Sequence, residues 1–336
     1  MSEEAQRGKH DLGRIAVARR RLNRARRRRR LRKAAPRLLG GPPDPPAPFI
    51  CGATRSGTTL LRLMVDAHPE VAIPSETHFV PDVIARCVEG PVEADELTQI
   101  ITSNRRWGDF GLGEDELRER IAAIDPLNAA DATRAFFHLY AEKQGKIRWG
   151  DKTPGYIRKT RPIQRVLPEA RFIHTIRDGR DVALSIIPLS FGPNTITEAA
   201  ELWRKRVGWA RYQSRGVEHY TEIFYEDLIL ETEKTLRQVC AFIDLPWNPA
   251  MLDYHEGAER RLAEKARDLD KGAGRTQPAE ARIRSHELAK EPPRADRVAR
   301  WKREMSEEDV AEYERVAGGL LVELGYELKQ SDPRKG

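Results

Sequence analysis

The sequence of 336 residues contains little cysteine and no long apolar run. Its three cysteines, Cys51, Cys87 and Cys240, form no Cys-x-x-Cys pair, which argues against a disulfide framework or zinc site and favours a reducing compartment. No stretch approaches the roughly 20 consecutive apolar residues of a membrane-spanning helix. Arginines interrupt the apolar residues near the N-terminus, where a signal peptide would have its core. We therefore expect a cytoplasmic protein.

The sequence also lacks a general excess of positive charge, because that excess is confined to one segment. The formal net charge is +7, but residues 1–48 hold 15 Lys and Arg against 4 Asp and Glu, and the remainder holds 44 against 48. This distribution removes the main support for nucleic-acid binding by the whole chain. We interpret residues 1–40 as a basic, disordered tail that could contact anionic partners, and residues 41–48 as a proline-rich linker.

Residues 49–330 alternate short apolar segments with amphipathic ones, which predicts a single α/β domain with a mostly parallel sheet. The predicted strands are 49–52, 71–73, 147–149, 171–176 and 222–225. The predicted helices include 59–67, 114–124, 130–142, 199–215, 232–243 and 306–324. Ser306 should cap the last of these, because its hydroxyl can accept a hydrogen bond from a free amide of the first turn. Residues 255–304 are highly charged and weakly periodic, and we interpret them as loops and short helices.

Residues 49–61 join an apolar strand to a helix through a glycine-rich loop, in which four residues separate Gly52 from Gly57. The amides of such a loop and the positive end of the helix dipole point at one place, which makes an anion site. In the loop that binds ATP or GTP, a lysine that contacts the β- and γ-phosphates stands where this sequence has Thr58. The basic side chain lies instead within the loop, at Arg55. The sequence therefore predicts an anion other than a nucleoside triphosphate.

Charged side chains follow three further predicted strands. They are Glu76, Lys152 and Arg177. Because open parallel sheets bind ligands beyond the carboxyl ends of their strands, we expect these side chains to converge with Arg55 at one edge of the sheet. The eight histidines show no clustered metal-ligand spacing, so no metal is expected.

The run Arg55-Ser-Gly-Thr-Thr-Leu-Leu-Arg62, followed by Asp66-Ala-His-Pro69, resembles the 5′-phosphosulfate loop of sulfotransferases that use 3′-phosphoadenylyl sulfate (PAPS). Within that superfamily the sequence is most similar to protein-tyrosine sulfotransferases and related bacterial enzymes. The resemblance covers about residues 49–330 and implies the sulfotransferase fold, a P-loop-type parallel β-sheet flanked by helices. It also implies in-line transfer of a sulfuryl group from PAPS to a hydroxyl of a peptide tyrosine, a carbohydrate or a natural product.

The resemblance implies a role for each matching residue. Glu76 would be the general base, and Lys152 would stabilise charge on the bridging oxygen together with Arg55. The phosphosulfate loop would bind PAPS through Arg55, Ser56, Gly57, Thr58 and Thr59. The remaining contacts with the nucleotide would come from Arg177 and Ser185 at the 3′-phosphate, and from Tyr225, Ser285 and Lys290.

The sequence departs from the family pattern at two positions. Leu189 stands where tyrosine sulfotransferases have another cofactor-binding arginine, and His78 replaces a basic residue two positions after the base. Two alternatives stay open: a P-loop kinase acting on a small molecule, which Thr58 disfavours, and a non-catalytic module tethered by its basic tail. Neither the acceptor nor the oligomeric state is indicated by a motif.

Overall fold

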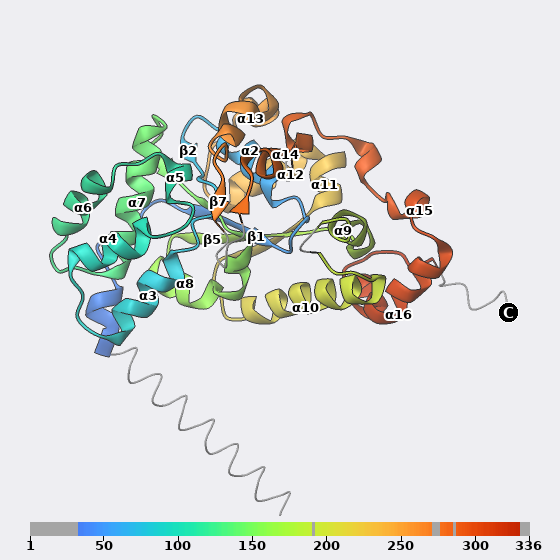
Figure 1. The fold of residues 1–336 in the computed structure, drawn as a ribbon, viewed down its shortest axis with the longest axis horizontal. Coiled ribbons are helices and arrows are strands. Elements are labelled where there is room, and N and C mark those ends of the chain that lie inside the picture. The colour runs from blue at the N-terminus through green and yellow to red at the C-terminus, as the bar shows by residue number, and fades with distance from the viewer. Residues whose placement is uncertain (1–32, 190–191, 271–275, 285–286, 330–336) are drawn as a thin grey trace, which may run out of the picture.

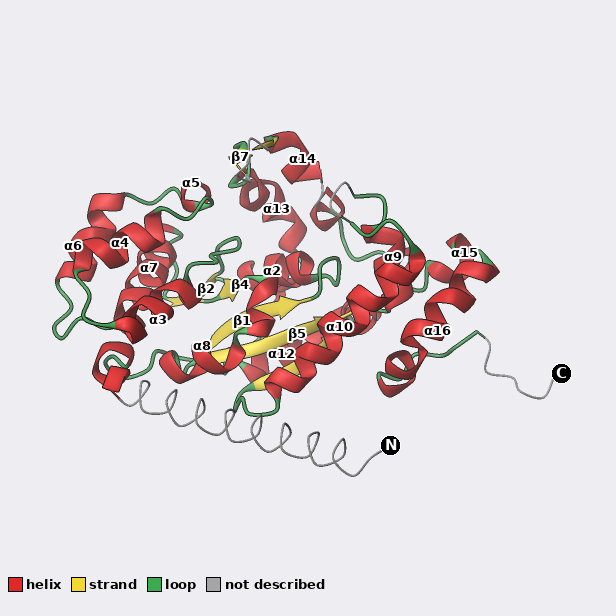
Figure 2. Ribbon diagram, turned by 60° about the horizontal axis from the view of Figure 1, so that its bottom comes forward, coloured by secondary structure: helices red, strands yellow, loops and turns green. Residues whose placement is uncertain are grey.

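The computed structural model describes residues 33–189, 192–270, 276–284 and 287–329. In these residues a four-stranded parallel sheet runs in the order β4-β1-β5-β6, with helices on both faces (Figures 1 and 2). Its strands are β4 (Asp151–Lys152), β1 (Ala47–Gly52), β5 (Ala170–Ile176) and β6 (Tyr220–Phe224). This arrangement confirms the predicted fold class.

Both faces of the sheet are buried, because successive residues of a strand point to opposite sides. In β1, Phe49 belongs to one apolar cluster and Ile50 to another. Helices contributing to the Phe49 cluster are α3 (Val80–Glu89), α7 (Ala129–Lys143) and α8 (Thr160–Val166). Helices contributing to the Ile50 cluster are α2 (Thr58–Asp66), α12 (Thr232–Phe242) and α13 (Tyr254–Ala263). Burial on both faces explains why β1 appears in the sequence as a continuous apolar run.

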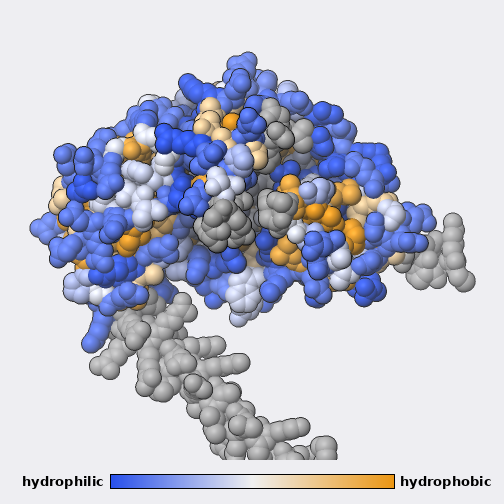
Figure 3. All heavy atoms as spheres, in the orientation of Figure 1, coloured by the Kyte–Doolittle hydropathy of each residue, from blue (hydrophilic) through white to orange (hydrophobic). Residues whose placement is uncertain are grey.

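A third apolar cluster lies where the C-terminal helix packs on the domain. It joins α9 (Gly179–Ile186), α10 (Ile196–Ser214) and α16 (Glu307–Glu323), with Trp203 and Tyr313 at its centre. Ser306 accepts a hydrogen bond of 3.0 Å from the amide of Asp309, so the predicted cap is confirmed. The face in Figure 3 is mostly hydrophilic, with apolar surface gathered near α9.

Shorter elements connect these layers. The remaining α-helices are α4 (Ala94–Thr102), α5 (Trp107–Phe110), α6 (Glu114–Ala122), α11 (Tyr225–Leu230), α14 (Ala279–Arg284) and α15 (Trp301–Glu304). The 3-10 helices are η1 (Pro154–Arg158), η2 (Pro249–Met251), η3 (Glu287–Lys290) and η4 (Ala295–Arg297). A short antiparallel pair is formed by β7 (Leu269–Asp270) and β8 (Thr276–Gln277).

Two predicted strands lie outside the main sheet. β2 (Val71–Ala72) and β3 (Arg148–Trp149) pair with each other, and the chain joins the main sheet only after Gly150, as β4. Glycine is needed at this junction, because a Cβ at position 150 would lie 2.7 Å from Cγ of Pro48. Sequence periodicity did not predict β4, since it has only two residues and both carry charge.

The packed part of the chain begins earlier than the predicted boundary at residue 49. Residues 33–38 are helical, and Ala34 and Leu38 are buried in the Phe49 cluster. The segment predicted as a linker is also held, because Asp44 accepts a hydrogen bond of 2.7 Å from the Trp149 indole. The tail and linker boundaries therefore need correction for residues 33–48, whereas residues 1–32 lie outside the described part of the chain.

Candidate active site

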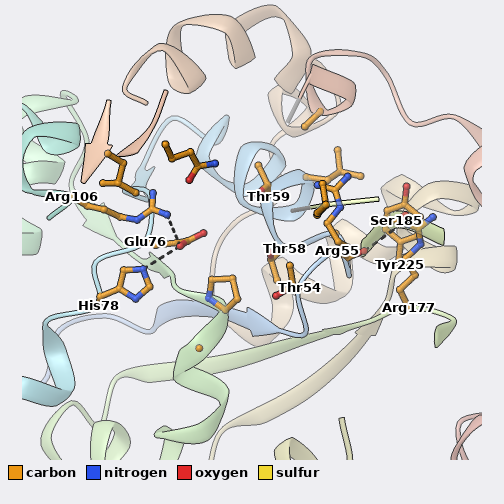
Figure 4. A pocket seen from close by; sticks show the side chains of 18 of the residues that line it. Thr54, Arg55, Thr58, Thr59, Glu76, His78, Arg106, Arg177, Ser185 and Tyr225 are labelled. Carbon is orange, nitrogen blue, oxygen red and sulfur yellow. Dashed lines mark hydrogen bonds and ion pairs between the residues drawn. The ribbon is translucent and has the colours of Figure 1, made fainter. Parts of the chain in front are cut away.

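A cleft of about 480 Å³ lies at the carboxyl ends of the parallel strands. Each strand of the main sheet is followed by residues that line it, as the strand-end rule predicts. Figure 4 shows two groups of side chains along the cleft. Glu76, His78 and Arg106 lie at one end, and Arg55, Arg177, Ser185 and Tyr225 lie at the other. Thr58 and Thr59 line the cleft between the two groups.

The cleft carries a strong excess of positive charge. Of the described residues that line it, only Glu76 is acidic, whereas six are arginines. The arginines are Arg55, Arg105, Arg106, Arg177, Arg297 and Arg300. A concave surface with charge of one sign concentrates ligands of the opposite sign, so the cleft is suited to a polyanion.

The glycine-rich loop has the backbone of an anion cradle. Arg55 and Gly57 adopt positive φ values of 70° and 90°, which turn the chain so that α2 starts directly below the cleft. α2 has no side-chain cap and no acidic residue in its first turn, so its free amides and dipole are left for a ligand. A Cβ at Gly57 would lie 2.5 Å from Cδ2 of Tyr225, which shows how closely this ring packs on the loop.

Arg177 is fixed at the arginine-rich end by backbone acceptors. It donates 3.0 Å and 3.4 Å hydrogen bonds to the carbonyl oxygens of Arg297 and Arg55, and its guanidinium lies 4.3 Å from the Tyr225 ring centroid. Burial lowers the pKa of Arg55, and the charges of Arg177 and Arg300 lower it further. Like charges held together in this way favour binding of an anion between them.

Glu76 forms the acidic centre of the other end. Oε1 lies 3.1 Å from Lys152 Nζ, and Oε2 lies 2.9 Å from Arg106 and 3.2 Å from His78 Nε2. Burial alone would raise the pKa of Glu76, but Lys152, together with His78 and Arg106, holds it well below its usual range. The carboxylate is therefore ionised at neutral pH and able to accept a proton.

Two buried lysines stand behind Glu76. Lys152 lies in β4 opposite Ile50, and burial lowers its pKa against the attraction of Glu76. Lys265 follows α13 and is 2% exposed, and its ammonium has no hydrogen-bond or ion-pair partner among the described residues. Burial, followed by the charge of Lys152, lowers the pKa of Lys265 well below its usual range.

The structure brings most of the predicted site residues to one cleft. Arg55, Gly57, Thr58, Thr59, Glu76, Arg177, Ser185 and Tyr225 line it. Ser56 and Lys152 are buried behind the wall. Ser285 lies outside the described residues. Lys290 ends η3, next to Ala289, which lines the cleft. Leu189 also lines the cleft, at the position where the family pattern predicts an arginine.

Arg180 has a structural role in this arrangement. Although it follows the same strand as Arg177, its guanidinium pairs with Asp178 at 2.7 Å and Glu314 at 2.6 Å and stacks on Trp301.

Sequence analysis missed Lys265 and the four arginines at positions 105, 106, 297 and 300. They come from segments without a motif, and only the fold brings the arginines to the cleft and Lys265 to the neighbourhood of Glu76.

A carboxylate that faces a glycine-rich anion loop across a basic cleft is suited to an enzyme that transfers a group from an anionic donor. A sequence model of the sulfotransferase family matches residues 46–249. The chain therefore belongs to the sulfotransferase family, whose members transfer a sulfuryl group to an acceptor hydroxyl. This finding confirms the resemblance and displaces the kinase and the non-catalytic module as alternatives.

The relatives by sequence are protein-tyrosine sulfotransferases. Protein-tyrosine sulfotransferase A of Caenorhabditis elegans is 25% identical over 86% of this chain and 69% of its own length. Human protein-tyrosine sulfotransferase 1 is 24% identical over 87% of this chain and 73% of its own length. For the Drosophila melanogaster enzyme the identity is 28%, and the match spans only 40% of that protein.

Solved structures share the fold. The sulfotransferase domain of the olefin synthase from Synechococcus PCC 7002 matches with a TM-score of 0.55 and 21% identity, covering 86% of this chain and 98% of that domain. The sulfotransferase domain from the curacin biosynthetic pathway gives a TM-score of 0.56 and 19% identity, over 85% of this chain and all of that domain. Both likenesses support the sulfotransferase fold.

The relatives contradict the expected cytoplasmic location. Protein-tyrosine sulfotransferases are Golgi membrane enzymes, so the cysteine count and the lack of a long apolar run were insufficient grounds for that expectation. In the described part of the chain, no helix is long and apolar enough to cross a membrane.

Proposed function

We propose that this protein transfers the sulfuryl group of PAPS to the hydroxyl of a tyrosine side chain, with Glu76 as the general base. The observation that carries the proposal is the presence of Glu76 and the anion loop in one cleft, separated by the threonines that open α2. The names of the relatives favour tyrosine over a carbohydrate or a natural-product alcohol.

Donors suited to the two phosphate groups of PAPS are present along the cleft. Ser56 Oγ and Arg177 Nε are buried and have no acceptor among the described residues. The free amides of α2, Arg55, Thr58 and Thr59 would hold the 5′-phosphosulfate. Arg177 and Ser185 would hold the 3′-phosphate, and Tyr225 would contact the nucleotide. Ser285 and Lys290 remain proposed contacts from the covering segment.

The chain's own residues account for each part of the transfer. PAPS would supply the sulfuryl group and leave as 3′-phosphoadenosine 5′-phosphate (PAP). Glu76 accepts the proton of the attacking hydroxyl as the new S–O bond forms, while Lys152 and Arg55 balance the charge on the oxygen of the departing phosphate. Lys152, which pairs with Glu76 at 3.1 Å, would have to turn toward that oxygen, and loss of its charge from Glu76 would make the carboxylate more basic. These cations provide the charge stabilisation, and the proposal includes no metal.

Glu76→Gln is the direct test. We expect turnover of radiolabelled PAPS with a tyrosine peptide to fall by a factor of about 10²–10⁴, because glutamine cannot accept the proton. PAP affinity by calorimetry should stay within a few fold, since Glu76 lies at the opposite end of the cleft from Arg55 and Arg177. Glu116→Gln, on the exposed side of α6, is the matched control. Turnover of Glu76→Gln equal to that of the control would remove Glu76 from the mechanism.

A further inference from the structure

A buried group of hydroxyls and one carboxylate lies directly beneath Glu76 and Lys152. Thr77 Oγ1 donates a 2.7 Å hydrogen bond to Asp151 Oδ2, and Thr153 Oγ1 donates one of 3.2 Å to the same oxygen. The Thr77 amide donates to Thr153 Oγ1 at 2.9 Å. Since the Thr77 hydroxyl proton points at Asp151, the Tyr156 hydroxyl, 2.9 Å away, donates to Thr77 Oγ1.

This group connects the two segments that carry the proposed base and its lysine. Thr77 follows Glu76 in the chain, and Asp151 precedes Lys152. Both are at most 1% exposed, so neither can contact a ligand in the cleft. In each of the two segments, the residue of the 3.1 Å Glu76–Lys152 ion pair is therefore the direct sequence neighbour of a residue of the Thr77–Asp151 hydrogen bond.

The connection is needed because neither segment is held firmly by its own secondary structure. β2 ends at Ala72, four residues before Glu76, and β4 has only two residues. His78 has a φ of 61°, a conformation that costs a non-glycine residue of this kind on the order of 1 kcal/mol. The hydrogen bonds of Thr77, and the 3.1 Å bond from the Val80 amide to the Tyr156 hydroxyl, hold the turn on both sides of His78.

Asp151 makes the group sensitive to the loss of a donor. Burial raises the pKa of Asp151 to about 7, whereas the hydrogen bonds from Thr77 and Thr153 and the charge of Lys152 act to lower it. Removal of the Thr77 hydroxyl would leave a buried carboxylate with one donor fewer, and the carboxylate would move or take up a proton. Either response would weaken the link between the segments that carry Glu76 and Lys152.

We propose that Thr77 is a positioning residue, which sets the distance and direction between Glu76 and Lys152 through its bonds to Asp151 and Tyr156. The inference rests on the proposed function, because it requires Glu76 to act as the base. Because Thr77 is fully buried, it would contact neither the donor nor the acceptor, and it would affect turnover only through the positions of Glu76 and Lys152.

The test is a double-mutant cycle of Thr77→Val and Glu76→Gln in the full chain. Valine keeps the shape of threonine and removes the hydroxyl. We expect kcat of Thr77→Val to fall by about tenfold to a hundredfold, because a displacement of about 1 Å at a reacting group has effects of that size. PAP affinity should change less than twofold, and Thr77→Ser, which restores the hydroxyl, should recover most of kcat.

The cycle separates positioning from a general structural role. If Thr77 acts through Glu76, Thr77→Val should lower kcat little further when Glu76 is already glutamine, whereas a structural defect would lower kcat equally in both backgrounds. An equal loss in both, or wild-type kcat in Thr77→Val, overturns the positioning role. Wild-type kcat in Glu76→Gln instead overturns the proposed function. If Thr77→Val does not fold, Tyr156→Phe, which removes the donor to Thr77, takes its place in the cycle.

Discussion

Lys265 is an amine buried near the proposed base, and its replacement by methionine tests whether the site retains this side chain at the expense of stability. The side chain is 2% exposed and has no hydrogen-bond or ion-pair partner in the described ranges. Burial, together with the charge of Lys152, lowers its pKa well below the ordinary value. Methionine has a similar length and can be buried without a partner.

The size of the effect follows from proton linkage. In the unfolded chain the pKa of lysine is 10.5, and the folded chain binds fewer protons below that pH. Stability therefore rises with pH, and the penalty at pH 7.5 cannot exceed the free energy of releasing the proton, about 4 kcal/mol. At pH 9 the same limit is about 2 kcal/mol. Lys265→Met should thus increase the free energy of unfolding by up to these amounts, with the larger gain at pH 7.5.

Denaturant unfolding at the two pH values measures this gain, with Lys205→Met, on the exposed side of α10, as the control. Turnover should fall by about tenfold or more, because an amine that can take up a positive charge near Glu76 when the anionic donor binds has been removed. A Lys265→Met protein that is less stable than wild type, with no pH dependence in the difference, would refute the reasoning.

Two further predictions concern Arg177 and a buried histidine. Arg177→Ala should weaken PAP binding by about tenfold to a hundredfold, because a charge-assisted hydrogen bond contributes about 1.5–3 kcal/mol. The control is Arg118→Ala, which removes a surface arginine of α6, and equal PAP affinities of the two variants would exclude Arg177 from the phosphate site. Burial, and to a smaller extent the charge of Arg211, lowers the pKa of His174 to about 3. Below pH 6.5 this histidine therefore binds a proton in the unfolded chain but not in the folded one. The free energy of unfolding then falls by about 1.4 kcal/mol for each pH unit of acidification. His174→Gln should flatten this decline in thermal unfolding between pH 6.5 and 5, and an unchanged slope would contradict it.

The phosphate loop could be predicted from the sequence because its geometry is local. Gly52, Gly57 and the strand and helix on either side lie within a few residues of one another, and each has a fixed backbone requirement. Glu76 and Arg177 were found for a similar reason, since each follows a recognisable apolar strand.

The rest of the site depends on contacts between distant segments. Arg106, the residue before α5, pairs with Glu76 across 30 positions of sequence, and Lys265 follows the end of α13. Both lie in charged segments where a functional side chain has the same appearance as a solvated one. For the same reason the sequence did not predict that the packed region begins before residue 49, because Ala34 and Leu38 are apolar positions within a strongly basic segment.

Calorimetric titration of the full chain with PAP, and with ATP in parallel, tests the central claim most directly. The site predicts a dissociation constant for PAP in the micromolar range or tighter, about −8 kcal/mol or better. ATP should bind at least about tenfold more weakly, because it lacks the 3′-phosphate that Arg177 and Ser185 would hold. Equal or tighter binding of ATP, or no binding of PAP, would contradict a cleft built for the sulfuryl donor.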